Sequence, residues 1–187
     1  MSETPETAGE LLAHVAEQEG RLTVHGFTHD DAWRLGTILV ELARERHLAV
    51  AIDIQRGEQQ VFHAGLRGST ADNDDWLARK VRTTKRFGRS SLAVRLESEA
   101  RAGGFDWLDP KLYALSGGCV PIRLADGALV GTATVSGLPD TGCVSGMIGT
   151  RSPLTVAGAA TVSVPVGYAS PCSLLIPWRY GRGNQRA

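Results

Sequence analysis

The chain has 187 residues, and its 20 lysines and arginines balance 20 aspartates and glutamates, so the formal net charge at pH 7 is zero. This length suits one domain, the charge lacks the basic excess of a nucleic-acid-binding protein, and no apolar run reaches the roughly 20 residues that span a bilayer. We therefore expect neither nucleic acid nor membrane as a partner. The opening MSETPETAGELLAHVAEQEG is acidic and polar, unlike a secretory signal, which predicts a cytoplasmic protein.

Two amphipathic helices are predicted in the N-terminal part of the chain. Apolar residues recur at helical spacing over residues 8–19, and an extended segment, 22–27, leads to Thr28, a residue type that caps helix N-termini. The second helix is predicted to run to about Arg46. Its buried stripe is expected to comprise Trp33, Ile38, Leu39, Leu42 and Ala43.

Two β-hairpins are predicted where apolar residues alternate with a period of two. The first has Val50, Ile52 and Ile54 in one strand, turns at residues 56–58 and continues in QQVFHAGL. The second pairs GGCVPIRL with ALVGTATVSGL across an Asp-Gly turn at residues 125–127.

Helices are predicted between the hairpins over residues 73–87 and 90–102, where Gly103-Gly104 ends the second. The order of helix, helix, hairpin, helices, hairpin is typical of one mixed fold class. We expect an α/β (α+β) sandwich in which an antiparallel β-sheet of two hairpins is covered by α-helices.

The composition changes after Pro139. Residues 140–187 are rich in glycine, valine, serine, threonine and proline and contain no acidic residue after Asp140. We interpret residues 1–139 as a single domain and 140–187 as an atypical Gly/Val/Pro-rich tail. The tail is either poorly ordered or partly strand-forming, and Pro165 would confine a strand there to a sheet edge.

The segment STADNDDWLARKVRTTKRFGRSS separates acidic from basic side chains along one predicted helix. The acids lie at its N-terminus, where they complement the helix dipole and cap free N–H groups. The basic side is a stripe at helical spacing formed by Arg79, Arg82, Arg86 and Arg89. Guanidinium groups bind carboxylates and phosphates in a bidentate manner, so this stripe is a candidate ligand contact. The alternatives are a solvated face, or pairing with aspartates of a neighbouring subunit.

The elements DNDDW, RFGRSS and VSGLP, in that order, resemble the haem-degrading-domain family, in its branch of uncharacterised conserved proteins. Wider relatives are the HbpS-like, GlcG-like and PduO C-terminal-like proteins. The resemblance covers roughly residues 22–139 and implies a profilin-like α/β sandwich that assembles as a homo-oligomer. Members of the family usually continue past VSGLP with an Asp-His pair and a final helix, whereas this chain continues with DTGCVSGMIGTRSP. A changed reading frame or a divergent natural tail would explain the departure.

The resemblance makes haem a candidate cofactor, although no cofactor is assigned. Haem iron takes an axial His, Cys, Met or Tyr, and the propionates pair with basic residues. The strand segment VFHAG supplies a histidine, for which a hydrogen-bonded place on the sheet is the alternative. The predicted ligand-binding residues are Trp76, Arg79, Arg82, Arg86, Phe87 and His63. The ligand would be a small acidic or tetrapyrrole-like molecule.

Catalysis is not indicated by any motif. The sequence lacks GxSxG, P-loop, HExxH and zinc-site patterns, and its three cysteines, Cys119, Cys143 and Cys172, are odd in number and widely spaced. Asp53 lies among apolar strand residues, where burial would raise its pKa; it is either a candidate acid or base or a hydrogen-bonded aspartate near the turn. The second hypothesis is a non-enzymatic assembly or scaffold protein whose arginine-striped helix forms a subunit or partner interface.

Overall fold

The computed structural model describes residues 7–138, so the predicted tail, residues 140–187, lies outside the described residues. Its helices are α1 (Ala8–Arg21), α2 (His29–Glu45), α3 (Ala71–Phe87) and α4 (Ser91–Ala100). Its strands are β1 (Thr23–Val24), β2 (Ala51–Arg56), β3 (Gln59–Gly65), β4 (Cys119–Leu124) and β5 (Leu129–Ser136). In this described part no helix is both long and apolar enough to cross a membrane.

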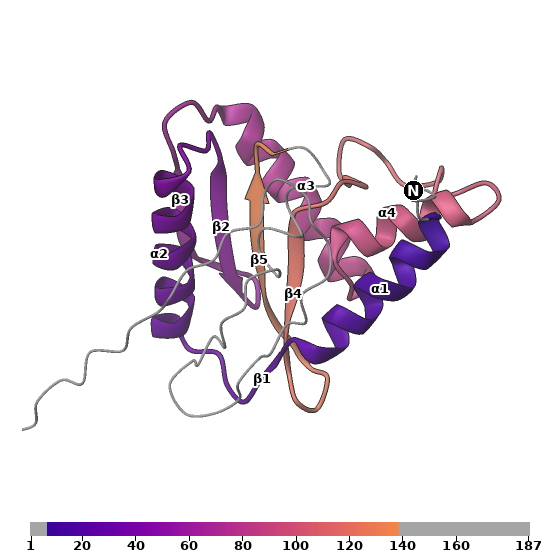
Figure 1. The fold of residues 1–187 in the computed structure, drawn as a ribbon, viewed down its shortest axis with the longest axis horizontal. Coiled ribbons are helices and arrows are strands. Elements are labelled where there is room, and N and C mark those ends of the chain that lie inside the picture. Colours follow the sequence, from indigo (N-terminus) through magenta and orange to yellow (C-terminus); the bar gives the residue numbers. More distant parts are fainter. Residues whose placement is uncertain (1–6, 139–187) are drawn as a thin grey trace, which may run out of the picture.

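One sheet joins all of these strands in the order β1-β4-β5-β2-β3 (Figure 1). The pairs β2–β3, β4–β5 and β2–β5 are antiparallel, so the two predicted hairpins lie side by side. The short β1 runs parallel to β4 and lies in the segment that the sequence predicted to be extended. The mixed α+β class and its two-hairpin sheet are confirmed.

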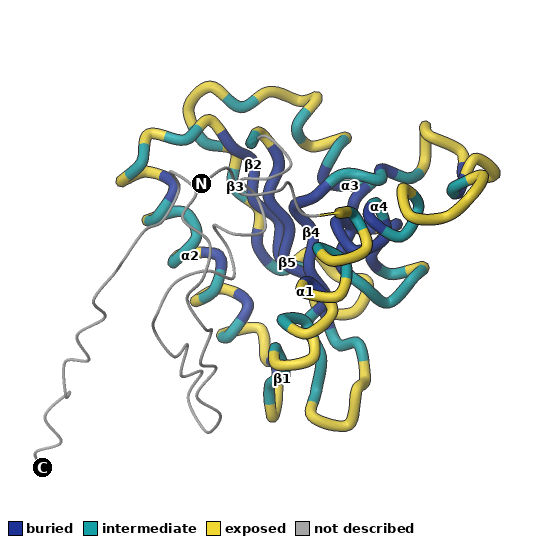
Figure 2. Tube along the Cα trace, turned by 45° about the vertical axis from the view of Figure 1, so that its right-hand side comes forward, coloured by how far each residue is buried: buried dark blue, intermediate teal, exposed yellow. Residues whose placement is uncertain are grey.

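The two faces of the sheet differ in polarity. One face carries Ile52 and Ile54 of β2, together with Val135 of β5, and this face packs against α2 in the main core. The opposite face carries Asp53, Thr134 and other polar residues, which are buried beneath α3. Helices α1 and α4 pack against each other beside the sheet (Figure 1). Figure 2 shows the central strands as the most deeply buried part of the trace.

The predicted buried stripe of α2 is wrong for Trp33, whose side chain is 58% exposed. The buried residues of α2 are the small ones, Ala32, Gly36 and Ala43, of which Ala43 was predicted. Leu39 of the predicted stripe is partly buried against the core. A Cβ atom on Gly36 would lie 2.3 Å from the Phe62 ring, so glycine is what allows the helix to approach the sheet closely. Trp33 instead contacts the edge of Phe62, with ring centroids 5.3 Å apart. The prediction failed because small side chains carry little hydrophobic signal.

Caps define the ends of the helix that carries the candidate site. Helix α3 begins two residues earlier than predicted, because Thr70 and Asn73 form a capping box, in which the Thr70 N–H donates to Asn73 Oδ1 at 2.8 Å. It ends at Gly88, which has a φ of 64°, a left-handed conformation that favours glycine. The Gly88 carbonyl accepts a hydrogen bond from Arg123 of β4, which fixes this end of α3 to the sheet.

Candidate functional site

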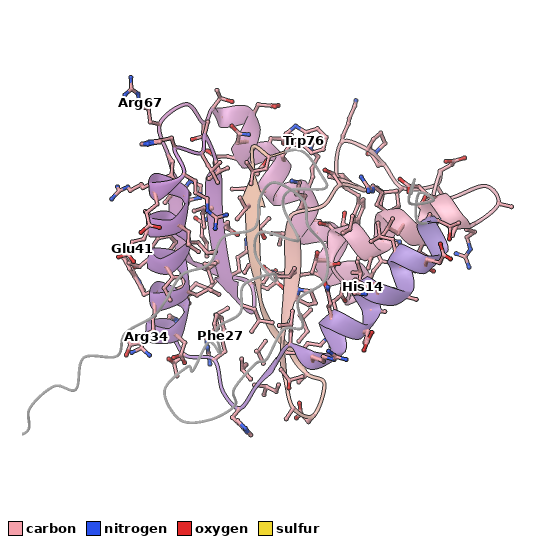
Figure 3. All side chains as sticks on the ribbon, viewed as in Figure 1. His14, Phe27, Arg34, Glu41, Arg67 and Trp76 are labelled. Carbon is pink, nitrogen blue, oxygen red and sulfur yellow. The ribbon has the colours of Figure 1, made fainter. Side chains whose placement is uncertain are left out.

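Helix α3 divides into a buried side and an exposed side. The buried side, which faces β5, β4 and β2, consists of Leu77, Lys80, Val81, Thr83 and Thr84. The opposite side carries Arg79, Arg82 and Arg86, which we call the arginine face. In Figure 3 the labelled Trp76 of this helix lies far from the labelled Arg34 of α2. The fourth arginine of the stripe, Arg89, pairs with Glu97 of α4 at 2.8 Å.

Arg79 and Trp76 form one unit of the arginine face. The Arg79 guanidinium lies over the Trp76 ring, 4.0 Å from its centroid, and its Nε contacts Asp75 Oδ2 at 2.8 Å. A further bond of 3.4 Å joins Arg79 to the Pro110 carbonyl. Cation–π and ion-pair contacts therefore already occupy this guanidinium within its own chain.

Arg86 is held by aromatic rings of the α4–β4 loop, residues 101–118. Its guanidinium lies 4.7 Å from the Trp107 centroid and 5.1 Å from that of Tyr113, and it donates to the Tyr113 hydroxyl at 2.9 Å. Phe87, the next residue, packs against Phe105 with centroids 5.1 Å apart and belongs to a small second core. Arg86 and Phe87 are thus brought together with the loop.

Arg82 has fewer contacts than Arg79 and Arg86. Like Arg86 it is exposed, and one bond of 3.3 Å joins its guanidinium to the Leu112 carbonyl. Since Arg82 lies one turn from both Arg79 and Arg86, all three contact the same loop. The arginine face therefore fixes the loop against α3 and also presents positive charge to solvent.

The α4–β4 loop supplies the part of the site that sequence reasoning missed. Among the described residues, Trp107 and Leu112 of this loop are two of the exposed large hydrophobic side chains, at 60% and 47% exposure. The loop is anchored by Thr83, whose Oγ1 donates to the Ala114 carbonyl at 3.0 Å and accepts from the Ala114 N–H at 3.1 Å. The aromatic-rich run FDWLDPKLY, which lies outside the predicted elements, was the available signal.

His63 lies on another flank of α3. It is in the edge strand β3, and its Nε2 is 3.5 Å from Asp74 Oδ1 in the first turn of the helix. Asp74 is about 120° around the helix from Arg86 and about 140° from Arg79; it is about 80° from Arg82 but about 12 Å from it along the axis. The structure therefore brings Trp76, Arg79, Arg82, Arg86 and Phe87 to the loop side of α3 and places His63 apart from them.

A buried polar layer lies between α3 and the sheet. Asp53, Thr134 and Cys119 lie in register across β2, β5 and β4. The Asp53 carboxylate accepts hydrogen bonds from Gln55 at 2.9 Å and Gln60 at 2.6 Å, and burial raises the pKa of this carboxyl. The burial that the sequence predicted is confirmed, and both glutamines satisfy the carboxylate as the hydrogen-bonded alternative expected.

Cys119 and Lys80 complete this layer. Burial raises the pKa of the Cys119 thiol to about 11, and the Thr134 hydroxyl donates to its sulfur at 3.0 Å. Lys80, which sequence reasoning did not place in the interior, is 3% exposed and donates to the Val135 carbonyl at 3.3 Å. The sequence signal for the burial of Lys80 was its position three residues after Leu77, which places both on the same face of the helix. The described residues contain no group of three or more side chains suited to a metal ion.

The fold and this site define a mixed α+β protein with a mainly antiparallel sheet and a cationic, aromatic helix face. The family model "Haem degrading protein HbpS-like" matches residues 27–142, more than half of the chain. The chain therefore belongs to the HbpS-like family of haem-degrading proteins.

Similar proteins carry names that assign no activity. A UPF0303 protein of Streptomyces coelicolor is 51% identical over 131 residues, which cover 68% of this chain and 83% of the relative. A UPF0303 protein of Rhizobium etli is 41% identical over 130 residues, covering 68% of this chain and 79% of the relative.

Solved structures of the same fold include the Ybr137w protein. It is 32% identical with a TM-score of 0.63, and the match covers 69% of this chain and 78% of that one. A crystal structure of HbpS and one of a PduOC:heme complex, both 18% identical, have TM-scores of 0.51 and 0.53. The HbpS match covers 63% of this chain and 82% of HbpS, and the PduOC match covers 62% and 86%. At this identity the likeness to HbpS and PduOC shows the fold alone.

Proposed function

We propose that the protein binds a small anionic, tetrapyrrole-like ligand at the arginine face of α3, and that haem is the first ligand to test. The observation that carries the proposal is the set of guanidinium groups on successive helical turns, bordered by the indole of Trp107. Arginine forks suit carboxylates, and an exposed aromatic ring suits a flat apolar ligand. Membership of a haem-degrading family supports this choice of ligand class.

Haem requires two kinds of contact from these residues, one for its propionates and one for its iron. The arginine face offers partners for the acidic propionates. Haem iron also takes an axial ligand, and the proposed one, His63, lies on a different flank of α3 beside Asp74. The propionate contacts and the axial contact are therefore proposed separately, and each needs its own variant in the test.

The test is a haem titration of the purified protein, followed at the Soret band. We expect saturation near one haem per chain. Arg82→Glu should weaken binding by roughly tenfold or more, because it replaces a charge-assisted hydrogen bond by repulsion. His63→Ala should shift the Soret maximum if the histidine is axial. Arg34→Glu is the matched control. Arg34 is an exposed residue of α2, far from Trp76 of α3, and this variant should bind like the wild type. A wild-type titration no different from that of a non-binding control protein would overturn the proposal.

A second candidate function is assembly through the same face into a homo-oligomer. The 60% exposure of Trp107 and the 47% exposure of Leu112 favour it, because exposed aromatic and apolar side chains beside arginines are typical of protein interfaces. Within one chain Asp75 already pairs with Arg79, so pairing of that aspartate across subunits would require an exchange of partners. Light scattering of Arg82→Glu distinguishes the two functions: smaller species support assembly, and an unchanged mass with lost haem binding supports the ligand site.

A further inference from the structure

We infer that Trp107 and Arg82 select the ligand of the arginine face: Trp107 contacts a flat ring, and Arg82 binds a carboxylate at the edge of that ring. The inference rests on the proposed function and narrows its ligand to one class, a polycyclic aromatic acid. It also moves the ring contact from the helix to the α4–β4 loop.

The three arginines are not equivalent. Arg79 is committed to Asp75 at 2.8 Å and to the Trp76 ring at 4.0 Å, and its side chain is 16% exposed. Arg86 is committed to the Tyr113 hydroxyl and to two aromatic rings. A ligand that recruited either guanidinium would have to break these contacts. Arg79 and Arg86 are therefore positioning residues that hold the loop on α3.

Arg82 has N–H donors available for a ligand carboxylate, whereas Arg79 and Arg86 already contact several groups of the chain. A guanidinium carries five N–H donors, and the described residues engage Arg82 through a 3.3 Å bond to the Leu112 carbonyl, which is long for this type of bond. Its side chain is exposed. An incoming carboxylate can therefore take a bidentate position on Arg82 without disrupting another ion pair of the described chain.

Trp107 is presented to solvent from a rigid support. Its ring meets Phe105 edge to face at 6.1 Å and Phe87 at 6.4 Å, and the Arg86 guanidinium lies 4.7 Å from its centroid. Despite these contacts the side chain remains 60% exposed. Holding a large apolar ring in a fixed, exposed position reduces the ordering cost of binding a flat molecule.

The ring contacts predicted from sequence are less exposed than Trp107. Arg79 lies over the ring of Trp76, which is partly buried, and Phe87 packs against Phe105 in the small core. Arg86 likewise lies over Trp107, but Trp107 remains 60% exposed. Arg86, which lies over Trp107, and Arg82 are four residues apart on α3, a rise of about 6 Å along the helix. Trp107 and Arg82 therefore lie on the same side of α3, next to the same loop, and an indole surface beside a carboxylate-binding group fits a rigid ligand that carries an acid at the edge of its ring system.

The test uses three probes on the full chain: haem, haem dimethyl ester, which keeps the ring and loses the acids, and citrate, which has acids and no ring. Trp107→Ala should weaken haem and its ester alike, by roughly tenfold, the range expected for loss of one aromatic stack. Arg82→Gln should weaken haem by a similar factor and leave the ester unchanged. Citrate should bind weakly to every variant.

Matched controls are Trp33→Ala, which removes another exposed tryptophan at 58% exposure, and Arg34→Gln on the same helix α2. Both should bind haem like the wild type. Trp107→Phe, which keeps a ring, should retain most of the affinity and guards against a folding defect in the alanine variant. If the wild type binds haem and Trp107→Ala and Arg82→Gln bind it equally well, the inference is overturned, whereas haem binding by the protein stands. If the wild type binds neither haem nor its ester, both are overturned.

Discussion

Cys119 shows how burial controls the chemistry of a single side chain. It is fully buried, and burial raises the pKa of its thiol to about 11, so the thiol is neutral at physiological pH. We expect iodoacetamide at pH 8 to leave Cys119 unmodified in the folded protein and to label it in guanidinium chloride. Mass spectrometry of the Cys119 peptide separates it from Cys143 and Cys172. Labelling of the folded protein at the unfolded rate would contradict this expectation.

Asp53 makes the stability of the protein depend on pH. Because burial raises its pKa in the folded state, the protonated carboxyl stabilises the fold at pH values below the unfolded pKa of about 4, and this contribution is lost as the pH rises through the folded pKa. Asparagine at this position cannot titrate. The free energy of unfolding of the wild type minus that of Asp53→Asn should therefore increase as the pH is lowered from 7 to 4, measured by urea denaturation. A difference that falls or stays constant would show that desolvation does not dominate.

At the scale of elements, the α4–β4 loop depends on α3 through Thr83. Its buried hydroxyl satisfies both the carbonyl and the N–H of Ala114. Thr83→Val keeps the shape of the side chain and removes both bonds. The Ala114 N–H retains a 3.4 Å bond to the Arg79 carbonyl, whereas the Ala114 carbonyl loses this donor, so we expect a loss of about 1–3 kcal/mol in the free energy of unfolding. Thr83→Ser keeps the hydroxyl and should lose less. Hydrogen exchange should also rise at Ala114 in the valine variant alone. If both variants lost the same free energy of unfolding, the effect would be due to packing and not to the hydroxyl.

The helices and hairpins could be predicted because their signals are local. The period of α3 and the alternation of β2 are set by neighbouring residues, and each appears where expected. The place of the α4–β4 loop could not be predicted, because it depends on contacts such as Arg86 with Tyr113, 27 residues apart. Trp33 of α2 was misassigned for a related reason: the close approach of the helix to the sheet at Gly36 involves the Phe62 ring, a residue of β3 distant in sequence.

The candidate site was predictable to the same extent. The helical periodicity of α3 predicted the arginine face, because the spacing of Arg79, Arg82 and Arg86 can be read from the sequence alone. It could not show that Arg79 and Arg86 are engaged within the chain, nor that an exposed Trp107 would lie beside them. Those facts belong to tertiary structure, and they decide which arginine is open to a ligand.

At the scale of the whole molecule, the sheet joins an apolar core to a polar layer. Ile54 on one face is fully buried in the main core, while Asp53, Thr132 and Thr134 are buried on the other face, beneath α3. Buried polar groups are stable only when hydrogen bonds replace those lost to water. The polar layer therefore stabilises the molecule to the extent that each of its groups has a partner.

Thr132 and Thr134 of β5 provide a matched test of that dependence. The Thr134 hydroxyl donates to Cys119, whereas within residues 7–138 the buried Thr132 hydroxyl has no hydrogen-bond partner. Thr132→Val removes an unsatisfied group with little change of shape, so we expect the free energy of unfolding to rise by about 1 kcal/mol. Thr134→Val removes a made bond and should lower it by a similar amount. Both are measured from denaturant midpoints at constant slope. If Thr132→Val destabilises the protein as much as Thr134→Val, the Thr132 hydroxyl has a partner in solution, and a buried water between α3 and β5 becomes the group to locate.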